Sequence, residues 1–460
     1  MKEFFLSLND AVHSLIWGPA MLCLLLGIGV YYTLRTGFFQ LRFWKTIWRC
    51  TVGGLLRKKV PSQAKGQVSS FQAAATSLAG CIGTGNIVGV ATALSSGGPG
   101  ALFWMWVSSF FGMILKYAEI LLGVHFKKKN AEGQIVGGPM YYLSVGLRQK
   151  WLGGIFAFSC ILASFGIGNM TQVNSITQSF SDMGNAGRLL IGVLVATLVG
   201  LVVWGGISRI AKISAVTVPF FAFFYLAGTI LILVFRANEI PHAFTSIFTD
   251  AFRFESAGGG ILGYLTMNAV RFGFSRGVFS NEAGMGSASI AHAAADSSNE
   301  VEEGMWGIFE VFFDTLLMCT ITGLVILTTG VLETGLDGAQ LTAAAFSSVF
   351  GSSFSGYFLT ISISMFAFAT LIGWYYYGES CVKYLFSHRP NMLLWYRFLY
   401  LSCTVLGAVM ELQVVWKISD TFNGFMVLPN LIGLIFLSGI VVRKTKEYEC
   451  LYKKNKKVLK

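Results

Sequence analysis

The sequence predicts an all-α polytopic membrane protein with eleven transmembrane helices. Its 460 residues are 54% hydrophobic and 12% charged, with a mean hydropathy of +0.64, whereas a soluble globular protein carries about 25% charged residues. Apolar runs long enough to cross a bilayer, which takes about 20 residues in a helix, recur along the chain. No polar stretch is long enough to form a core of its own. We therefore treat residues 1–460 as a single transmembrane domain.

The apolar runs give the expected helices, numbered as spans 1 to 11 in chain order. Span 1 is longer than the apolar core of a cleavable signal, which has about 7–15 residues. Its basic cluster also follows it instead of preceding it, so we expect span 1 to remain in the membrane. The spans lie at 12–34, 69–96, 100–126, 151–180, 187–207, 212–236, 258–281, 303–331, 354–386, 391–411 and 421–442.

The distribution of basic residues indicates the orientation. The connection 35–66 holds eight Lys and Arg residues and no acidic residue, so the positive-inside rule places it in the cytoplasm. With eleven spans, the N-terminus then lies outside and the basic tail 443–460 lies inside. The predicted inner loop 282–303 carries five acidic residues and no basic one, but acidic residues count little in this rule. The net charge of +12 is therefore explained by topology and does not indicate nucleic-acid binding.

The cysteines and histidines indicate neither a metal centre nor a disulfide framework. The eight cysteines are scattered, mostly in apolar runs, and they form no CxxC pair. The five histidines are isolated and show no HExxH spacing.

Span 2 contains a pattern that a helix facing only lipid would not favour. Gly80, Gly83 and Gly85 fall within six residues, beside Thr84 and Asn86. Each Gly costs a helix interior about 0.8–1 kcal/mol relative to Ala, and free backbone groups are costly in hydrocarbon. Such a segment is favoured where the helix is interrupted inside the protein and its freed N–H and C=O groups bind a solute and an ion. The alternative is that the glycines only allow close helix packing.

A second glycine-rich interruption follows five spans later. The sequence RFGFSRGVFSNEAGMGS at 271–287 includes the end of span 7, which crosses in the opposite direction to span 2. Two sets of five helices in opposite orientation, each opened by a broken helix, are typical of inverted-repeat transporters. We assign the first repeat to 69–236 and the second to 258–442, with 12–34 as an extra helix.

Three motifs resemble the signatures of the alanine-or-glycine:cation symporter family: GTGNIVGVATAL at 83–94, GGPMYYL at 137–143 and GFSRGVFSNEAGMGSASIAHAA at 273–294. Their order and spacing fit over nearly the whole chain. The family comprises prokaryotic sodium/amino-acid symporters and is similar in architecture to LeuT-type transporters, with an added N-terminal helix. The resemblance therefore implies sodium-coupled import of alanine or glycine by alternating access across a prokaryotic cell membrane.

A zwitterionic amino acid needs hydrogen-bond donors for its carboxylate and acceptors for its ammonium. The outer half of span 2 begins near Thr84, Gly85 and Asn86. Its free N–H groups and positive dipole end therefore point to the membrane centre and suit the carboxylate. Carbonyl groups of the broken span 7, around Phe274 to Gly277, suit the ammonium. We expect these residues to bind substrate.

Span 4 and three aromatic residues complete the expected substrate pocket. Asn169 and Gln172 share one face of this unusually polar span, and we expect them to line the pocket. The alternative for each amide is a hydrogen bond between helices, worth about 0.6 kcal/mol. A methyl side chain needs a small pocket closed by aromatic rings, for which Phe279 and Trp374 are the candidates, with Phe274 next. The alternative for each ring is plain packing within the bundle.

The resemblance also implies a sodium site between spans 2 and 9, built from hard oxygen ligands. Alignment on the Gly-x-Gly-Asn interruption places Ala79 and Ile82 as carbonyl donors. Span 9 offers the carbonyl of Ala367 and the hydroxyl of Thr370. The alternative for Thr370 is a hydrogen bond back to its own helix. Sodium is the expected coupling ion, and the number of ions stays open.

Charged residues inside spans are functional hypotheses by default. Glu310 and Asp314 lie one helical turn apart in span 8, and Arg271 and Arg276 lie in span 7. We expect structural ion pairs between neighbouring helices. The alternative is that a carboxylate titrates and couples protons, which would make the protein a proton-coupled amino-acid carrier.

Two further charge pairs and one motif are expected near the inner interface. Lys116 with Glu119, and Glu379 with Lys383, have the spacing of ion pairs at helix ends. The segment 137–143 follows a Lys cluster and is expected to form a short interfacial helix. Its place is one where an inner gate could close.

One rival function comes from a different class of protein. The segment 273–277 matches the GxSxG pattern of serine hydrolases, with Ser275 as nucleophile and His292 downstream. A nucleophile needs a base within about 3 Å, yet His292 lies in a predicted inner loop. A hydrolase or a channel would also leave the paired interruptions unexplained. The sequence leaves open alanine, glycine or serine, L or D substrate, sodium or proton coupling, and the oligomeric state.

Overall fold

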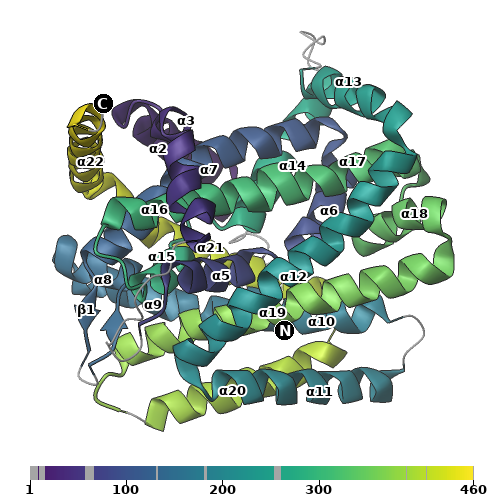
Figure 1. Cartoon of the computed structure of the whole chain (residues 1–460). Helices are drawn as coiled ribbons and strands as arrows, with labels where there is room; N and C mark the ends of the chain where they lie inside the picture. The colour runs from purple at the N-terminus through teal and green to yellow at the C-terminus, as the bar shows by residue number, and fades with distance from the viewer. Residues whose placement is uncertain are drawn as a thin grey trace.

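The computed structural model describes residues 9, 16–56, 67–130, 133–180, 184–252, 261–389, 391–410 and 412–458, and these residues are mostly helical. Many of the long helices run in roughly the same direction, across the view in Figure 1. A short antiparallel hairpin, Lys128–Lys129 (β1) with Ile135–Val136 (β2), lies at one end of the bundle. The described chain is therefore an all-α helical bundle, as predicted.

Seven helical segments of the described chain are long and apolar enough to cross a membrane, and two bent pairs raise the number to nine. The seven segments coincide with predicted spans 3–6 and 8–10, and the first bent pair coincides with span 2. The second bent pair covers span 11 but continues to Lys454, within the predicted tail 443–460. Spans 1 and 7 correspond to Pro19–Arg35 (α2) and Ile261–Asn281 (α14), and the count of eleven stays a prediction. The seven segments are Gly100–His125 (α7), Lys150–Ser179 (α9, η4 and α10), Asn185–Val203 (α11), Gly206–Phe235 (α12), Glu300–Thr328 (α16, η6 and α17), Ser352–Leu385 (α19) and Asn391–Val409 (α20). The bent pairs are Ser70–Cys81 with Thr84–Gly97, at 60°, and Thr421–Phe436 with Ser438–Lys454, at 59°.

The remaining elements subdivide these segments or connect them. Two connections that hydropathy left without structure hold helices, α13 after α12 and α18 before α19. The bounds are Phe39–Arg42 (α3), Trp44–Cys50 (α4), Val52–Leu56 (η1), Ser70–Cys81 (α5), Thr84–Asn86 (η2), Val88–Gly97 (α6), Pro139–Tyr141 (α8), Tyr142–Gly146 (η3), Lys150–Phe165 (α9), Gly166–Met170 (η4), Thr171–Ser179 (α10), Ala237–Glu239 (η5), Ile240–Ala251 (α13), Ser287–Ala293 (α15), Glu300–Val311 (α16), Phe312–Cys319 (η6), Thr320–Thr328 (α17), Val331–Thr334 (η7), Gly338–Phe350 (α18), Leu412–Phe436 (α21) and Ser438–Val458 (α22).

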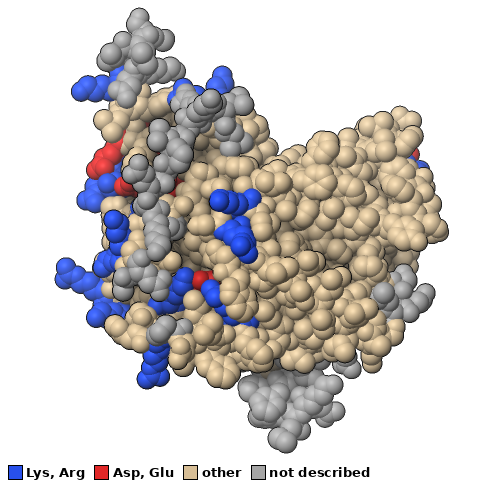
Figure 2. All heavy atoms as spheres, turned by 60° about the horizontal axis from the view of Figure 1, so that its bottom comes forward, with Lys and Arg blue, Asp and Glu red and all other residues tan. Residues whose placement is uncertain are grey.

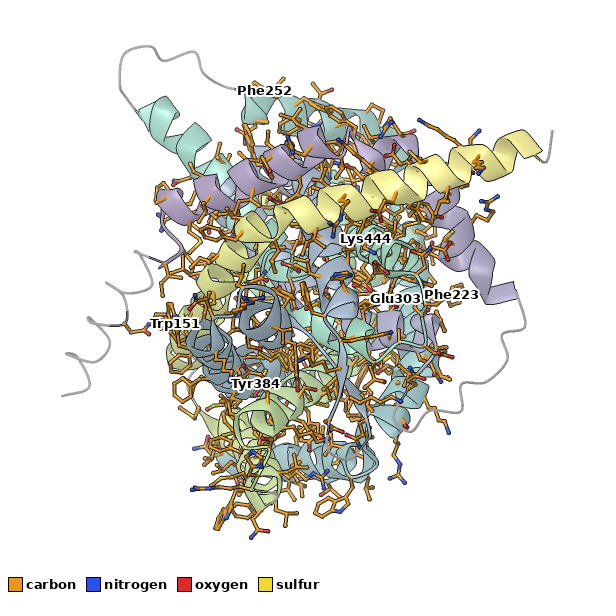
Figure 3. All side chains as sticks on the ribbon, turned by 90° about the vertical axis from the view of Figure 1, so that its left-hand side faces the viewer. Trp151, Phe223, Phe252, Glu303, Tyr384 and Lys444 are labelled. Carbon is orange, nitrogen blue, oxygen red and sulfur yellow. The ribbon has the colours of Figure 1, made fainter. Side chains whose placement is uncertain are left out.

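Burial distinguishes a core helix from the outer helices. In α7, 83% of the crossing segment is buried, against 39% in α11 and 28% in both α12 and α20. Helix α7 packs against both α14 and α16. The outer helices expose large apolar side chains, such as Phe223 of α12, which is labelled in Figure 3. Contiguous apolar surface of this kind is typical of contact with lipid.

Lys and Arg side chains gather at one end of the bundle. Figure 2 shows them concentrated along one edge, while most of the remaining surface in that view is neither basic nor acidic. Arg42 pairs with Glu449 at 2.7 Å, and Lys444 pairs with Glu300 at 3.0 Å. Helix α22, which holds Lys444 and Glu449, lies across this end (Figure 3). The connection after span 1 and the C-terminal helix therefore lie at the same end, as the predicted topology requires.

The first interrupted crossing has the form that the sequence predicts. Helix α5 begins with a capping box between Ser69 and Gln72 and ends at Cys81. Ile82 has extended backbone angles, and the chain resumes as a 3₁₀ turn and then as α6. The two parts meet at 60°. Glycine at position 83 allows the interruption to lie close to α19, because a Cβ atom there would lie 2.7 Å from the hydroxyl of Thr370.

The second crossing is interrupted later in the chain than predicted. Helix α14 runs without a break through 274–277 and ends at Asn281, and α15 starts at Ser287. Gly277 serves close packing instead, because a Cβ atom there would lie 2.2 Å from the hydroxyl of Ser108 in α7. The expectation of freed carbonyl groups at 274–277 is therefore wrong, since these residues belong to an intact helix.

Most of the segment 282–303, predicted as an inner loop, is buried in the protein: residues 282–295 are all buried, whereas 296–300 and Glu302 are partly or fully exposed. It contains α15, and Glu282, His292 and Glu303 are at most 2% exposed. Lys127 fixes its end by donating hydrogen bonds from its ammonium to the carbonyls of Ala295 and Ser297, at 3.1 and 3.0 Å. Partial burial lowers the pKa of Lys127, although nearby carboxylates act in the opposite direction. The hydropathy pattern missed α15 because the helix is short and its polar groups are paired internally.

A single parallel bridge joins the ends of α5 and α15 that are remote from the interruptions. Val68 pairs with Ala295, through hydrogen bonds from the Val68 N–H to Ala294 O at 3.1 Å and from the Asp296 N–H to Val68 O at 2.8 Å. Helices α5 and α15 are thus connected at the ends that lie away from the pocket.

Candidate functional site

A small buried pocket lies between the two interruptions. Its free volume of about 10 Å³ leaves room for about one water molecule. Larger hollows lie elsewhere, one of them on the outer surface between α11 and α20, and we give them no role because they lie away from both interruptions. Six predicted site residues line the small pocket: Thr84, Gly85, Gln172, Phe279, Thr370 and Trp374. Gly80, Cys81, Gly83, Ile167 and Glu282 complete its wall.

The wall formed by the first interruption offers hydrogen-bond donors. In the 3₁₀ turn, the N–H groups of Asn86 and Ile87 bond to the carbonyls of Gly83 and Thr84. Among the described residues, the N–H groups of Thr84 and Gly85 have no acceptor. The hydroxyl of Thr84 lies 3.4 Å from Oε1 of Gln172. This wall can therefore bind an anionic group.

The opposite wall carries a carboxylate that the sequence analysis did not include in the site. Glu282 follows the last residue of α14 and has a φ of 56°, which is uncommon for a residue other than glycine. Its Oε1 accepts a hydrogen bond from Nε1 of Trp374 at 2.9 Å, and its Oε2 accepts one from the hydroxyl of Ser287 at 2.5 Å. No Lys, Arg or His lines the described pocket. The Glu282 carboxylate can therefore receive a cationic group of a ligand.

Gln172 lies in the pocket and Asn169 does not. The Nε2 of Gln172 donates to Ile167 O at 2.9 Å, which fixes the amide beside Thr84. The Nδ2 of Asn169 donates to Tyr400 O at 2.7 Å, so this side chain connects span 4 to span 10. The two amides were expected on one face, but the π-helical turn η4 changes the rotation per residue between them. Asn169 thus follows the alternative of a hydrogen bond between helices.

Asn86 also turns away from the pocket. Its Oδ1 accepts the Gly83 N–H at 3.1 Å, and its Nδ2 donates to Oδ1 of Asp314 at 2.8 Å. The same carboxylate accepts hydrogen bonds from the hydroxyls of Ser280 and Thr315. Asn86 therefore braces the interruption from behind, and Asp314 is held by neutral donors instead of by the expected ion pair.

Phe274 and Gly277 lie outside the pocket wall. Phe274 is buried beside Trp104 of α7, with ring centroids 6.3 Å apart. Both residues sit on the face of α14 that packs on α7, about one to two turns before the interruption. The structure therefore gives Phe274 the alternative of plain packing, while Phe279 and Trp374 take the positions expected of the closing rings.

Two of the four expected sodium ligands are brought together. The hydroxyl of Thr370 lies 3.5 Å from Ile82 O and 3.1 Å from Phe366 O of its own helix. Ala79 and Ala367 are fully buried on α5 and α19, which pack against each other. Carbonyl and hydroxyl oxygens suit a hard monovalent cation. The donor types thus fit a sodium ion, and the ligand set stays a prediction.

The expectations for charged residues have mixed outcomes. Glu379 and Lys383 form the expected ion pair at 2.7 Å. Lys116 is fully buried and pairs with Glu310 at 3.2 Å, so the expectation of a Lys116–Glu119 pair at a helix end is wrong. Glu119 instead accepts a hydrogen bond from Asn430 at 2.7 Å. The physical reason is that α7 lies in the core, where residues distant in sequence reach its side chains.

The segment 137–143 forms a short helix that is buried and not interfacial. Pro139 opens α8 as expected, but Met140 and Tyr142 are fully buried. A Cβ atom at Gly138 would lie 2.7 Å from the side chain of Ile290 in α15. This motif therefore packs against α15.

The geometry gives no support to a serine hydrolase. The hydroxyl of Ser275 donates to Phe272 O in its own helix at 3.4 Å. The ring nitrogens of His292 lie 2.7 Å from Glu303 and 2.6 Å from Glu310. Ser275 and His292 are thus engaged with different partners.

Two interrupted helices that face one another across a pocket of mixed polarity, inside a bundle with an apolar exterior, define a multi-pass membrane transporter. The model of the sodium:alanine symporter family matches residues 2–460. This chain therefore belongs to the sodium:alanine symporter family. The protein lies in the cell membrane and takes part in amino-acid transport by symport. The family consists of transporters and not of enzymes.

Individual relatives agree with this assignment. The chain is 42% identical over 461 residues to the sodium/alanine symporter AgcS of Methanococcus maripaludis, covering 98% of this chain and 99% of that protein. It is 38% identical over 450 residues to the probable sodium/glutamine symporter GlnT of Bacillus subtilis, covering 97% and 91%. Among solved structures, a Na⁺-coupled sialic acid symporter in a substrate-bound outward-open state aligns with a TM-score of 0.52 at 15% identity, covering 87% of this chain and 81% of that chain. At this identity the likeness concerns the fold alone.

Proposed function

We propose that this protein is a sodium-coupled symporter that imports a small neutral amino acid, alanine or glycine, by alternating access. The observation that carries the proposal is the polarity of the pocket. Free N–H groups of Thr84 and Gly85 line one wall and the Glu282 carboxylate lines the other. An amino acid carries a carboxylate and an ammonium, so the two walls complement its two charged ends. The N–H groups receive the carboxylate, and the Glu282 carboxylate receives the ammonium.

The dimensions of the pocket favour a small side chain. Phe279 and Trp374 close it, and its free volume is about 10 Å³, so even alanine enters only after the walls separate. Alternating access supplies such a movement. The name of the relative GlnT indicates that a larger substrate is carried within the family. The narrow pocket is our reason for proposing alanine or glycine here.

Sodium is the proposed coupling ion. Two relatives are named as sodium symporters, and the Thr370 hydroxyl lies beside Ile82 O at the edge of the pocket. The carbonyls of Ala79 and Ala367 would complete the proposed ligand set. An ion there would hold the first interruption against α19 and prepare the adjacent N–H groups for substrate.

We also propose the full topology of eleven crossings as a LeuT-type pair of inverted repeats, 69–236 and 258–442, with the N-terminus outside and the C-terminus in the cytoplasm. The opposed interruptions and the basic end of the bundle support it. Labelling of single cysteines introduced in the tail and in the N-terminal segment, in intact cells and in inverted vesicles, tests the orientation.

The function is tested by uptake into proteoliposomes. Radiolabelled alanine, glycine, serine and glutamine are offered under an inward gradient of sodium, of lithium, or of protons alone. We expect saturable accumulation of alanine or glycine with sodium and much less with the other gradients. Accumulation driven by protons alone would replace sodium as the coupling ion. Failure of every neutral amino acid under every gradient would overturn the proposed function.

A further inference from the structure

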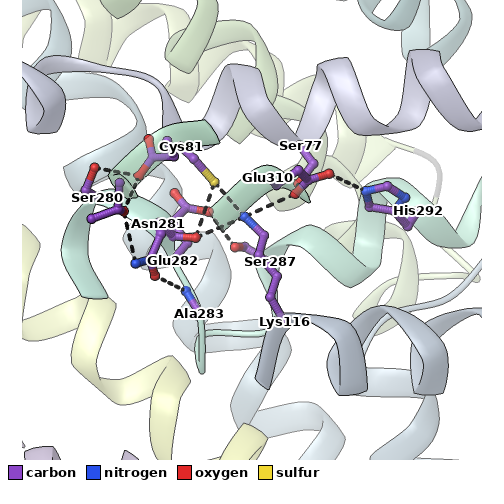
Figure 4. Close-up of polar contacts among 12 residues, drawn as sticks. Ser77, Cys81, Lys116, Ser280, Asn281, Glu282, Ala283, Ser287, His292 and Glu310 are labelled. Atoms are coloured by element: carbon purple, nitrogen blue, oxygen red, sulfur yellow. Dashed lines mark hydrogen bonds and ion pairs between the residues drawn. The ribbon is translucent and has the colours of Figure 1, made fainter. Parts of the chain in front are cut away.

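A fully buried ammonium lies at the junction of the two interrupted crossings. The Nζ of Lys116 in α7 is 2.9 Å from Sγ of Cys81, 2.9 Å from the carbonyl of Asn281 and 3.2 Å from Oε2 of Glu310 (Figure 4). Lys116 is 0% exposed. Burying a charged group destabilises the folded protein unless ion pairs and hydrogen bonds compensate the charge. The three partners of this ammonium therefore identify what it holds together.

Two of these partners are helix ends at the interruptions. Cys81 is the last residue of α5, and Asn281 is the last residue of α14. The final carbonyls of a helix lack partners within the helix and form its negative dipole end, where a cation is stabilising. The Asn281 carbonyl accepts from Lys116, and the Cys81 thiol approaches the same carbonyl at 3.6 Å. One side chain of the core helix thus contacts both crossings where they lose their helical structure.

The third partner keeps the ammonium in place. Oε2 of Glu310 also accepts a hydrogen bond from the hydroxyl of Ser77 at 2.6 Å, and Oε1 lies 2.6 Å from Nε2 of His292. The other ring nitrogen of His292 lies 2.7 Å from Glu303. Glu310 is therefore fixed from α5 and α15 as well as from its own helix α16, and this leaves Lys116 little freedom to move.

The ends that Lys116 holds are part of the pocket wall. Cys81 lines the pocket, and Glu282, which lines the opposite wall, follows Asn281 directly. We propose that Lys116 is a positioning residue of the transport site, whose ammonium fixes the separation of the two interruptions and thereby the distance between the two walls. The inference rests on the proposed function, because the pocket is taken as the site of the amino acid. Lys116 itself does not line the pocket, so it acts through the ends that it holds.

A structural ion pair is the competing explanation, and two variants separate the two roles. Glu310→Gln removes the ion pair but leaves the ammonium with its contacts to Cys81 and Asn281. The double variant Lys116→Met/Glu310→Gln removes the ammonium as well and leaves no unpaired charge at this point. Glu379→Gln/Lys383→Met is the matched control, because it removes a pair of 2.7 Å on α19 that contacts neither interruption.

The measurement is sodium-driven alanine uptake in proteoliposomes, with folded yield and unfolding temperature recorded for each variant. A misplacement of about 1 Å in a binding site can cost about 100-fold. We therefore expect the double variant to raise the KM for alanine and the half-saturating sodium concentration by about tenfold or more. Glu310→Gln should stay within about threefold of the wild type, and the control should match the wild type.

Three results would overturn the positioning role. These are wild-type KM and sodium half-saturation in a folded double variant, equal impairment of Glu310→Gln and the double variant, and loss of folded protein only when the ammonium is removed. A readout without substrate keeps the test separate from the proposed function. A bound ion raises the unfolding temperature, and the double variant should lose the sodium-induced rise that Glu310→Gln keeps. If the wild type moves no neutral amino acid, the proposed function fails while this second readout still decides the role of Lys116.

Discussion

The two interrupted crossings occupy matching places in the bundle but are built differently. The first interruption spans about two residues, carries no charge and uses glycine for close approach: Gly83 has a φ of −142°, and a side chain there would meet Thr370. The second covers 282–286 and uses the left-handed region, with a φ of 56° at Glu282, 92° at Gly284 and 81° at Gly286. The first presents N–H groups to the pocket, and the second presents a carboxylate.

Under the proposed inverted-repeat topology, this difference would allow two related interruptions to bind the two unlike ends of an amino acid. Both interruptions free backbone groups, but only the second adds a side-chain charge. The strained backbone at Glu282 costs about 1–3 kcal/mol, and such strain persists where the surroundings fix it. Here Trp374 and Ser287 hold the carboxylate toward the pocket. Substitutions at Glu282, Gly83, Thr370 and Asn169 test this division of roles.

Neutralising the second interruption should have the largest effect. We expect Glu282→Gln to raise the KM for alanine by about 10- to 100-fold, because a hydrogen bond to a charged group contributes about 1.5–3 kcal/mol. Concentration-dependent uptake in proteoliposomes measures it. Glu302→Gln, on an exposed part of α16, is the control. A wild-type KM in Glu282→Gln would remove the carboxylate from substrate recognition.

Adding a side chain at Gly83 in the first interruption should have the second-largest effect. In Gly83→Ala the new methyl group would lie 2.7 Å from the Thr370 hydroxyl, whereas in Gly85→Ala the nearest atom is 3.5 Å away. Overpacking of this kind costs about 1–3 kcal/mol, so we expect sodium-driven uptake to fall about tenfold in Gly83→Ala. Gly85→Ala should lose less. Equal losses in the two variants would show that close approach at Gly83 is not the reason for that glycine.

Removing one proposed sodium ligand should have an intermediate effect. Thr370→Ala removes the hydroxyl beside Ile82 O, and a neutral hydrogen-bonding oxygen contributes about 1 kcal/mol. We expect the half-saturating sodium concentration to rise about fivefold, with Thr370→Ser near the wild type. Uptake measured against sodium concentration at fixed alanine distinguishes the variants. If Thr370→Ser is as weak as Thr370→Ala, the hydroxyl is not a ligand.

The smallest effect is expected at Asn169, which connects helices outside the pocket. Asn169→Ala should lower the free energy of unfolding by about 0.6 kcal/mol and leave the KM for alanine within about twofold. Thermal unfolding in detergent and uptake measure the two quantities. Gln172→Ala provides the comparison, because it removes an amide that lines the pocket. A larger rise in KM for Asn169→Ala than for Gln172→Ala would reverse this assignment.

Composition and glycine spacing predicted much of the fold. The cost of glycine in a membrane helix indicated the interruption at Gly83, and five-span spacing indicated its counterpart. The second interruption was placed too early because glycine has two uses. Gly277 of α14 serves packing on α7, whereas Gly284 and Gly286 serve backbone angles, and the sequence pattern does not distinguish the two.

The charged part of the site was the hardest to predict. The apolar run of span 7 ends at 281, so the hydropathy pattern places Glu282 in a loop. Its burial depends on α15, a helix of seven residues. Lys116 was paired with Glu119 by helical spacing, but the partner that reaches its ammonium is almost two hundred residues away. Pairing across a bundle is set by tertiary packing, which local spacing does not encode.

The parallel bridge between Val68 and Ala295 has a consequence for movement. Helices α5 and α15 are joined at the basic end by the Val68–Ala295 bridge. At the other end of α5, Cys81 lines the pocket, and at the other end of α15 the hydroxyl of Ser287 holds Glu282 of the pocket wall. Under the proposed alternating-access mechanism, this bridge would make α5 and α15 tilt together. Opening of the protein toward that face would then move both walls of the pocket away from the substrate at the same time.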